Sequence, residues 1–126
     1  MPIEHVTVSA KARDQLIALK RRTGIDNWNI LCRWALCVSL AEPAPPADAK
    51  HPADSNIDMA WKTFAGQHDE LYWAIVRQRC ISDGLDPKDE EQVAHQFRLH
   101  LHRGIAYLTG DKKLQSIGDL VGRVAP

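Results

Sequence analysis

Apolar residues along most of this chain recur at intervals of three and four, which is typical of helices with one buried side. Such a pattern covers residues 10–22, where basic residues occupy much of the remaining surface. Ser9 can cap this helix through its hydroxyl, and Gly24 suits the left-handed position that ends it. Residues 5–8 alternate and are β-branched, which predicts a short strand or extended arm. The apolar side of the helix consists of Ala12, Leu16 and Leu19.

A second helix is predicted from Asp26 or Asn27 to about Ala41, where Pro43 would stop it. Nearly every position in this helix is apolar, and Arg33 is the only charge between Asn27 and Ala41. A helix that is apolar on nearly all sides must be buried on nearly all sides. In a chain of 126 residues the most economical cover is another subunit, so the pattern predicts a homo-oligomer. The interface residues expected on this helix are Trp28, Leu31 and Trp34.

Residues 43–58 interrupt the helical pattern and form a proline-rich connecting loop. Four of the seven prolines fall within this segment, which excludes a regular helix or a central strand. The loop is not interpreted as a domain boundary, because neither flank is large enough to fold alone. The chain is therefore expected to form a single domain over residues 1–126.

The second half of the chain predicts two long helices and a short terminal one. The first covers about residues 68–82 and ends at Gly84, and Arg77, Gln78 and Arg79 are expected to face outward. Its inward residues are expected to be Leu71, Tyr72, Ile75, Val76 and Cys80.

The next helix has the clearest start, with Asp86 as N-cap, Pro87 at the first helical position and three acids in the first turn. It ends at Gly110, and residues 116–121 form a short terminal helix. The predicted architecture is all-α: a compact four- to five-helix domain, with at most a short N-terminal strand, that assembles as a homo-oligomer.

Charge is balanced over the whole chain but unevenly distributed along it. The 16 basic and 16 acidic side chains give a formal net charge of zero, whereas residues 1–40 hold six basic residues against three acids, or +3, which leaves −3 for the remainder. Basic residues stabilise the last turn of any helix, so Lys20, Arg21 and Arg22 have a purely structural interpretation. With Lys11 and Arg13 on the same helix, repeated in each subunit, the five residues also predict a DNA-binding surface that contacts phosphates without reading bases.

Motifs for catalysis, cofactors and metals are missing from the sequence. It contains no phosphate-binding glycine loop, no dinucleotide fingerprint and no nucleophile elbow. His95, His100 and His102 lack the spacing for a shared metal on one helix, so they are expected to be solvated or interface histidines. The sequence therefore predicts no catalytic residue, no metal and no cofactor.

The three cysteines, Cys32, Cys37 and Cys80, form no CxxC pair, and their apolar neighbours predict buried, inert thiols. Without a signal peptide or a membrane-length apolar stretch, a cytoplasmic protein with reduced thiols and no membrane association is expected.

Four strings of the sequence, taken in order and spacing, resemble one family. They are LKRRTG (Leu19 to Gly24), LCRWALCVSLAEP (Leu31 to Pro43), DGLDP (Asp83 to Pro87) and FRLHLHRGIAYLTG (Phe97 to Gly110). Over about residues 6–120 the chain is similar to the small DndE proteins of bacterial DNA phosphorothioation systems. These systems replace a non-bridging phosphate oxygen of DNA with sulfur, and other members of the cluster supply the sulfur chemistry.

The resemblance implies a helical homo-tetramer that binds double-stranded DNA, with a preference for nicked duplex, and that works with the other proteins of the modification complex. By motif it transfers a DNA-binding role to Lys20, with Arg22 beside it, whereas Lys11 and Arg13 rest on the charge argument alone. The turn of residues 23–27, which includes Thr23, Gly24 and Ile25, would fix the helix pair that builds the oligomer. A longer loop at residues 44–56 and a tail past Leu120 depart from the family pattern.

Three functional hypotheses follow from the sequence. The first is a DNA-binding accessory subunit of the sulfur-modification machinery with no catalytic site of its own. The second is an assembly scaffold that bridges the other modification proteins without touching DNA, favoured by the apolar second helix and the zero net charge. The third, a small enzyme that uses Cys32, Cys37 or the histidines, has the least support.

Overall fold

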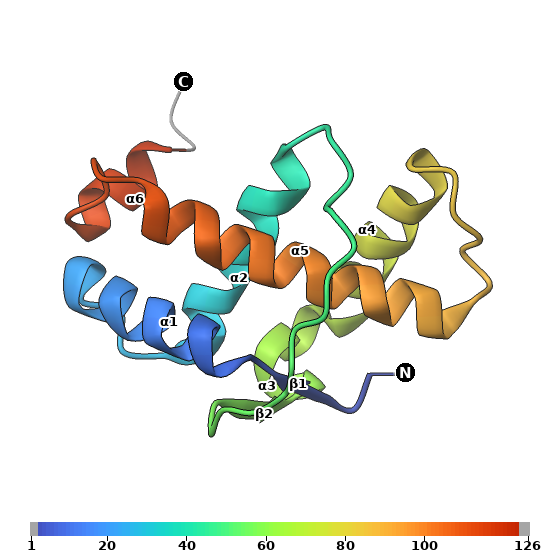
Figure 1. Ribbon diagram of the computed structural model, residues 1–126, viewed down its shortest axis with the longest axis horizontal. Helices are drawn as coiled ribbons and strands as arrows, with labels where there is room; N and C mark the ends of the chain where they lie inside the picture. The colour runs from blue at the N-terminus through green and yellow to red at the C-terminus, as the bar shows by residue number, and fades with distance from the viewer. Residues whose placement is uncertain (1–2, 124–126) are drawn as a thin grey trace.

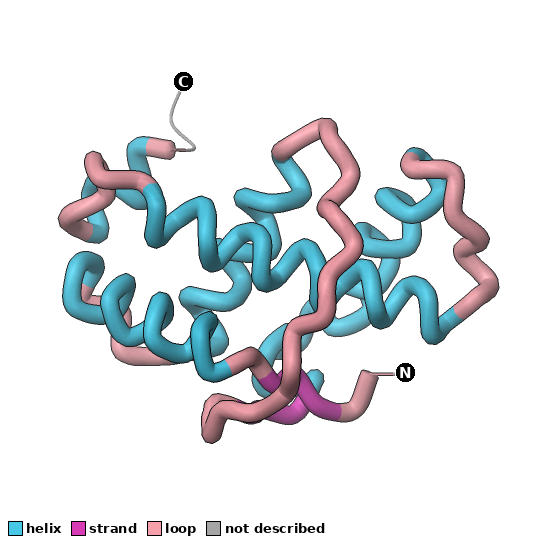
Figure 2. The backbone as a smooth tube through the Cα atoms, in the orientation of Figure 1, coloured by secondary structure: helices cyan, strands magenta, loops and turns pink. Residues whose placement is uncertain are grey.

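Helix α5 runs the length of the molecule, and the other elements pack around it (Figure 1). The computed structural model describes residues 3–123, which are mostly helical with one small sheet (Figure 2). The elements are β1 (His5–Thr7), α1 (Ala10–Thr23), α2 (Trp28–Ala41), β2 (Asp58–Ala60), α3 (Trp61–Ala65), the 3₁₀ helix η1 (Gly66–His68), α4 (Asp69–Ser82), α5 (Glu90–Gly110) and α6 (Ile117–Gly122).

The core lies where α2 crosses α5, with α1 and α6 at one end and α3 and α4 toward the other (Figure 1). Leucine and isoleucine side chains from α1, α2 and α5 fill the first part. An aromatic cluster fills the second, with Phe64 of α3 and Phe97 of α5 at ring centroids 5.2 Å apart. The expected all-α fold class is confirmed, with a two-stranded sheet as its only β structure within residues 3–123.

Local signals in the sequence place the start and end of α1 correctly. The Ser9 hydroxyl accepts a hydrogen bond from the Ala12 N–H at 3.1 Å, as expected of an N-cap. Gly24 takes the left-handed conformation with φ of 75°, and its N–H donates to the Lys20 carbonyl. Ser116 caps α6 in the same manner as Ser9 caps α1, through the Asp119 N–H.

The predicted start of the last long helix is wrong by one turn. Helix α5 begins at Glu90, and its N-cap is Asp89, whose carboxylate accepts from the Gln92 N–H at 3.2 Å. Asp86 instead accepts from the Lys88 N–H at 2.9 Å within a turn that contains Pro87. Both aspartates bond a backbone N–H two or three residues later, so the local pattern alone could not distinguish a turn from a helix cap.

Two short elements at the end of the proline-rich segment escaped the sequence analysis. Strand β2 pairs antiparallel with β1, with Val6 opposite Met59, and α3 follows at once. Because the two strands lie about fifty residues apart in the sequence, no periodicity over three residues indicates them. Residues 43–57, named here the strap, have no regular structure and pass in front of α5 in the view of Figure 1.

The predicted orientation of α4 is partly wrong. Leu71 and Ile75 were expected to face inward, but they are 55% and 40% exposed. Val76 and Cys80 are buried as predicted, whereas Arg79 does not point outward. Its guanidinium donates to the carbonyls of residues 40, 42, 43 and 44 at the C-terminus of α2. Arg79 is thereby held against the end of α2 by one carbonyl of its last turn and three carbonyls of the residues that follow it.

Candidate nucleic-acid interface

The basic residues of α1 lie on two opposite flanks of the helix. At 100° per residue, Arg13 and Lys20 share one flank, and Lys11 and Arg22 share the other. Arg21 lies between the flanks on the side that faces away from the core. The five predicted DNA-binding residues therefore surround the solvent side of α1 and form no single row.

The flank with Arg13 and Lys20 faces the start of α2. The Lys20 ammonium lies over the ring of Trp28, 5.2 Å from its centroid, which is a cation–π contact. Arg13 contacts the neighbouring Asp14 at 3.4 Å, and Asp14 is the only acid on α1. The structure thus brings Lys20, predicted to bind DNA, against Trp28, predicted to lie at the oligomer interface.

The flank with Lys11 and Arg22 faces the strap and the end of α5. Arg22 is half-buried, and its guanidinium donates to the Thr109 carbonyl at 2.8 Å, so it connects α1 to the last turn of α5. Lys11 is exposed. Within residues 3–123, no carboxylate forms an ion pair with Lys11, Lys20, Arg21 or Arg22. The positive charge of α1 is therefore compensated only by Asp14.

The turn between α1 and α2 is held by buried side chains within the protomer. The buried Thr23 hydroxyl donates to the Leu19 carbonyl at 2.8 Å and accepts from the Ile25 N–H at 3.2 Å. Ile25 and Leu31 are also buried within the protomer. Thr23, Ile25 and Leu31 therefore fix the angle between the two helices, and their side chains offer little surface to another subunit.

Helix α2 keeps an uncovered apolar stripe on the side opposite α5. Ile30, Trp34, Cys37 and Ala41 follow one another at intervals of four, three and four, and all are partly or fully exposed. A hollow of about 340 Å³ opens on this stripe, lined by Ile30, Arg33, Trp34, Cys37 and Tyr72. The sequence required α2 to be covered on nearly all sides, and within the protomer this stripe remains open.

A buried polar network closes the C-terminus of α2. The Ser39 hydroxyl accepts from Arg103 Nε at 2.8 Å and lies 2.8 Å from His100 Nδ1. Burial, reinforced by the positive charges of Arg103 and Arg79, lowers the pKa of His100 to about 4. Ser39 and His100 are almost completely inaccessible, so this serine–histidine pair cannot reach a substrate. Its role is structural: it joins α2 to α5.

A second buried histidine joins β1, α1 and α5. His102 Nε2 accepts from the Ser9 N–H at 3.2 Å, and its Nδ1 lies 2.8 Å from the Arg98 carbonyl. Burial is the main cause that lowers the pKa of His102 to about 4, and the hydrogen bond to the Arg98 carbonyl acts in the opposite direction. The expectation that the histidines are solvated or at an interface is therefore wrong for His100 and His102. Each ring has one hydrogen-bond partner distant in sequence, Ser39 for His100 and the Ser9 N–H for His102, whereas Nε2 of His100 is buried without a partner among the described residues.

The three cysteines differ in their surroundings. Cys32 is buried, and its burial raises the pKa of its thiol to about 12, while Cys80 is also buried. Cys37 is exposed on the apolar stripe of α2, which corrects the expectation that all three thiols are buried.

Neither a metal centre nor a membrane span emerges from the described residues. Among residues 3–123, no three histidine, cysteine, aspartate or glutamate side chains come together in a way that could hold a metal ion. No helix in this part of the chain combines the length and apolar character needed to cross a bilayer.

Comparison with known proteins matches the chain to one family and to six solved chains, which include two crystal structures of DndE. The family model described as DNA sulphur modification protein DndE matches residues 5–116. A crystal structure of DndE from Escherichia coli B7A, involved in DNA phosphorothioation modification, is 23% identical with a TM-score of 0.68 and covers 86% of this chain and 98% of its own. A crystal structure of a glycine-to-lysine mutant of DndE, involved in DNA phosphorothioation, is 19% identical with a TM-score of 0.61. The match covers 83% of this chain and 97% of the mutant's chain. No curated protein sequence matches the chain.

Proposed function

This chain belongs to the DndE family of DNA sulphur modification proteins, and from that premise we propose that it is a DNA-binding accessory subunit of the modification machinery. In this proposal α1 contacts DNA phosphates, and the chain itself catalyses no step. The observation that carries the proposal is the solvent side of α1, where Lys20 and Arg21 have no carboxylate partner among the described residues. A surface of this kind binds the phosphate backbone with little regard to sequence.

Self-association would multiply this surface. We expect the apolar stripe of α2 to pack against other copies of the chain, in a homo-tetramer as the family resemblance implies. At 100° per residue Trp28, which Lys20 contacts, lies on the side of α2 opposite the stripe, so packing of copies on the stripe would leave this flank of α1 uncovered. Several copies of α1 on one particle would give a multivalent DNA-binding surface. The preference for nicked duplex is the one that the family resemblance implies.

The first test is a titration of labelled intact and nicked duplex DNA at two salt concentrations, with the mass of the protein measured in the same buffers. Log affinity should fall linearly with log salt, since bound phosphates release counterions. The double variant Lys20→Glu/Arg21→Glu should weaken binding at least tenfold and reduce the salt slope, with the oligomer unchanged. Arg22 is left intact because its guanidinium holds the end of α5.

A matched control separates the site from overall charge. Arg77→Glu/Lys88→Glu makes the same charge change on exposed residues of α4 and of the turn before α5. This variant should bind DNA as the wild type does. Equal loss of affinity in both variants, or no loss in either, would overturn the assignment of the DNA surface to α1.

One observation favours a second candidate function. The open stripe of α2, together with the exposed Leu71 and Ile75 of α4, would suit a scaffold that bridges other proteins of the modification system. That role predicts no binding to either duplex at low salt and tight binding to a partner protein. The DNA titration with the intact oligomer therefore separates the two functions.

A further inference from the structure

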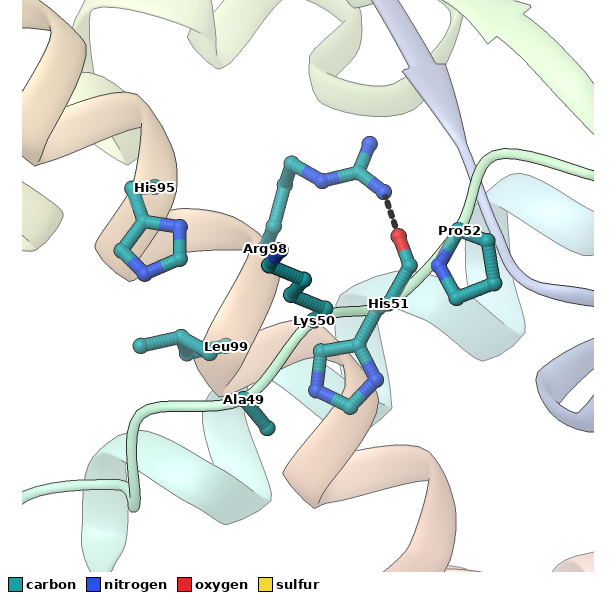
Figure 3. A pocket seen from close by; sticks show the side chains of 7 residues that line it. All are labelled: Ala49, Lys50, His51, Pro52, His95, Arg98 and Leu99. Atoms are coloured by element: carbon teal, nitrogen blue, oxygen red, sulfur yellow. Dashed lines mark hydrogen bonds between the residues drawn. The ribbon is translucent and has the colours of Figure 1, made fainter.

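A cationic hollow lies between the strap and α5, apart from the solvent side of α1. It has a volume of about 320 Å³. His95 and Arg98 of α5 line it on one side and Lys50 and His51 of the strap on the other, and the Arg98 guanidinium points toward the His51 carbonyl (Figure 3). Ala49, Pro52 and Leu99 supply its apolar lining. Every ionisable side chain in the lining is therefore a lysine, an arginine or a histidine.

Arg98 contributes a positive charge, and no carboxylate within residues 3–123 forms an ion pair with it. One guanidinium nitrogen donates to the Thr7 carbonyl at 3.1 Å, and another donates to the His51 carbonyl at 2.7 Å. Carbonyl groups satisfy hydrogen bonds but carry no net charge. A guanidinium has five N–H donors, so Arg98 retains donors for a ligand while it ties the strap to α5.

Two further contacts, made by His51 and Asp54, hold the strap against α5 and α1. The His51 ring stacks on His102 of α5, with centroids 4.1 Å apart and an angle of 11° between the planes. The Asp54 carboxylate accepts from the Ala10 N–H at 2.7 Å, which joins the strap to the start of α1. The hollow is therefore formed in advance, and a ligand would not have to order the strap.

The electrostatic surroundings of His51 support an excess of positive charge. Burial lowers the pKa of His51, and the charges of Arg98, His95 and Lys11 lower it further. Lys11 belongs to α1, so the positive region continues from the hollow to the basic helix.

His95 already holds a carboxylate at the mouth of the hollow. Its Nε2 lies 2.6 Å from an Asp48 carboxylate oxygen. The Asp48 side chain is 87% exposed, so it can move into solvent at little cost. An oxyanion of an incoming ligand can then take the position of this carboxylate against the imidazole.

We propose that the hollow between the strap and α5 is a second phosphate site, which takes a phosphodiester of the DNA backbone between Lys50, His95 and Arg98. The inference rests on the proposed DNA-binding function and extends it. Lys11 connects the hollow to α1, so one duplex would follow a continuous path from the solvent side of α1 to the strap. Asp48 competes with the phosphate for His95 and limits the affinity of the site.

The test compares three single variants in the full-length oligomer. Lys50→Ala should weaken duplex binding roughly fivefold at low salt and lower the salt slope by about 0.9 for each subunit that contacts DNA. Asp48→Asn should tighten binding, because it removes the competing charge and keeps the size of the side chain. Lys88→Ala removes an exposed lysine from the turn before α5 and should leave binding unchanged.

A second measurement follows the site without relying on duplex affinity. Titration with a dinucleotide that contains one phosphodiester should shift the imidazole NMR signals of His95 in the wild type and much less in Lys50→Ala. The site is refuted if Lys50→Ala binds duplex like the wild type and the His95 signals do not shift with the dinucleotide. In that case, loss of duplex binding in Lys20→Glu/Arg21→Glu would still support the DNA-binding function of α1. If the wild type binds no duplex, the proposed function fails, and the response of His95 to the dinucleotide alone supports or refutes the site.

Discussion

Gly104 of α5 lies directly against the backbone of Ala35 of α2. A Cβ at position 104 would come within 1.7 Å of the Ala35 carbonyl oxygen and 2.4 Å of its carbonyl carbon. The atoms in the way belong to the backbone, so no side-chain rotation can relieve the clash. The missing side chain of Gly104 is therefore what allows the two central helices to cross so closely.

We predict that Gly104→Ala lowers the free energy of unfolding by about 3 kcal/mol or more, because α2 and α5 would have to separate. Urea unfolding followed by circular dichroism measures this change. Gly110→Ala is the control, since position 110 is helical and has no atom near the added methyl group. It should be neutral or stabilising by up to about 1 kcal/mol. Similar stability of the two variants would show that the helices cross less closely.

Stability should fall as the pH is lowered from 7 toward 4. Burial lowers the pKa of His100 and of His102 to about 4, whereas an unfolded histidine titrates near 6.5. Between these values the unfolded chain binds more protons than the folded protein. The stabilisation is therefore complete above about pH 6.5 and is lost as the pH falls toward 4. Each histidine accounts for on the order of 2 kcal/mol at pH 5 relative to pH 7.5.

Denaturant unfolding at pH 5 and at pH 7.5 tests this dependence. His102→Gln should reduce this pH dependence by about half, because His100 keeps its share, even if the variant is less stable at neutral pH through its altered contact with the Ser9 N–H. His68→Gln replaces an exposed histidine and should keep the wild-type dependence. If the stability of His102→Gln changes with pH as that of the wild type does, His102 is not a source of the pH dependence.

The parts of the fold that the sequence predicted are those fixed by neighbouring residues. Ser9 and Gly24 act on N–H and carbonyl groups within four residues of themselves, so their types and positions alone define α1. Strand β2 depends on β1, which lies about fifty residues earlier, and Arg79 depends on carbonyls at the end of α2. Such contacts leave no periodic trace, so the sequence could not reveal them.

The same distinction applies to the candidate site. The basic character of α1 was evident from composition, but the opposite placement of Lys20 and Arg22 and the structural role of Arg22 required the position of Thr109. The hollow beside the strap escaped prediction altogether. Lys50 and His95 lie 45 positions apart, and only the folded strap brings them to one place.

The apolar stripe of α2 should determine the oligomeric state. We predict that Trp34→Glu converts the oligomer to monomers, because a charge at the centre of the stripe would have to be buried between copies. Light scattering after size-exclusion chromatography measures the mass, and circular dichroism shows that the protomer remains folded. Ile81→Glu places the same charge on an exposed apolar residue of α4 and should leave the mass unchanged. An oligomer that survives Trp34→Glu would locate the interface elsewhere.

Thiol labelling should report directly on the same stripe. Cys37 is exposed, whereas Cys32 and Cys80 are buried, so dilute native protein should react rapidly at one thiol and denatured protein at three. Partial burial raises the pKa of the Cys37 thiol, so the reaction is best followed at about pH 8. If copies pack on the stripe, the rate at Cys37 should fall as the protein concentration rises, and Trp34→Glu should abolish that fall. Cys37→Ser supplies the control, with no rapid labelling at any concentration. A rate that stays constant across the range in which the mass increases would show that the stripe of α2 faces solvent in the oligomer.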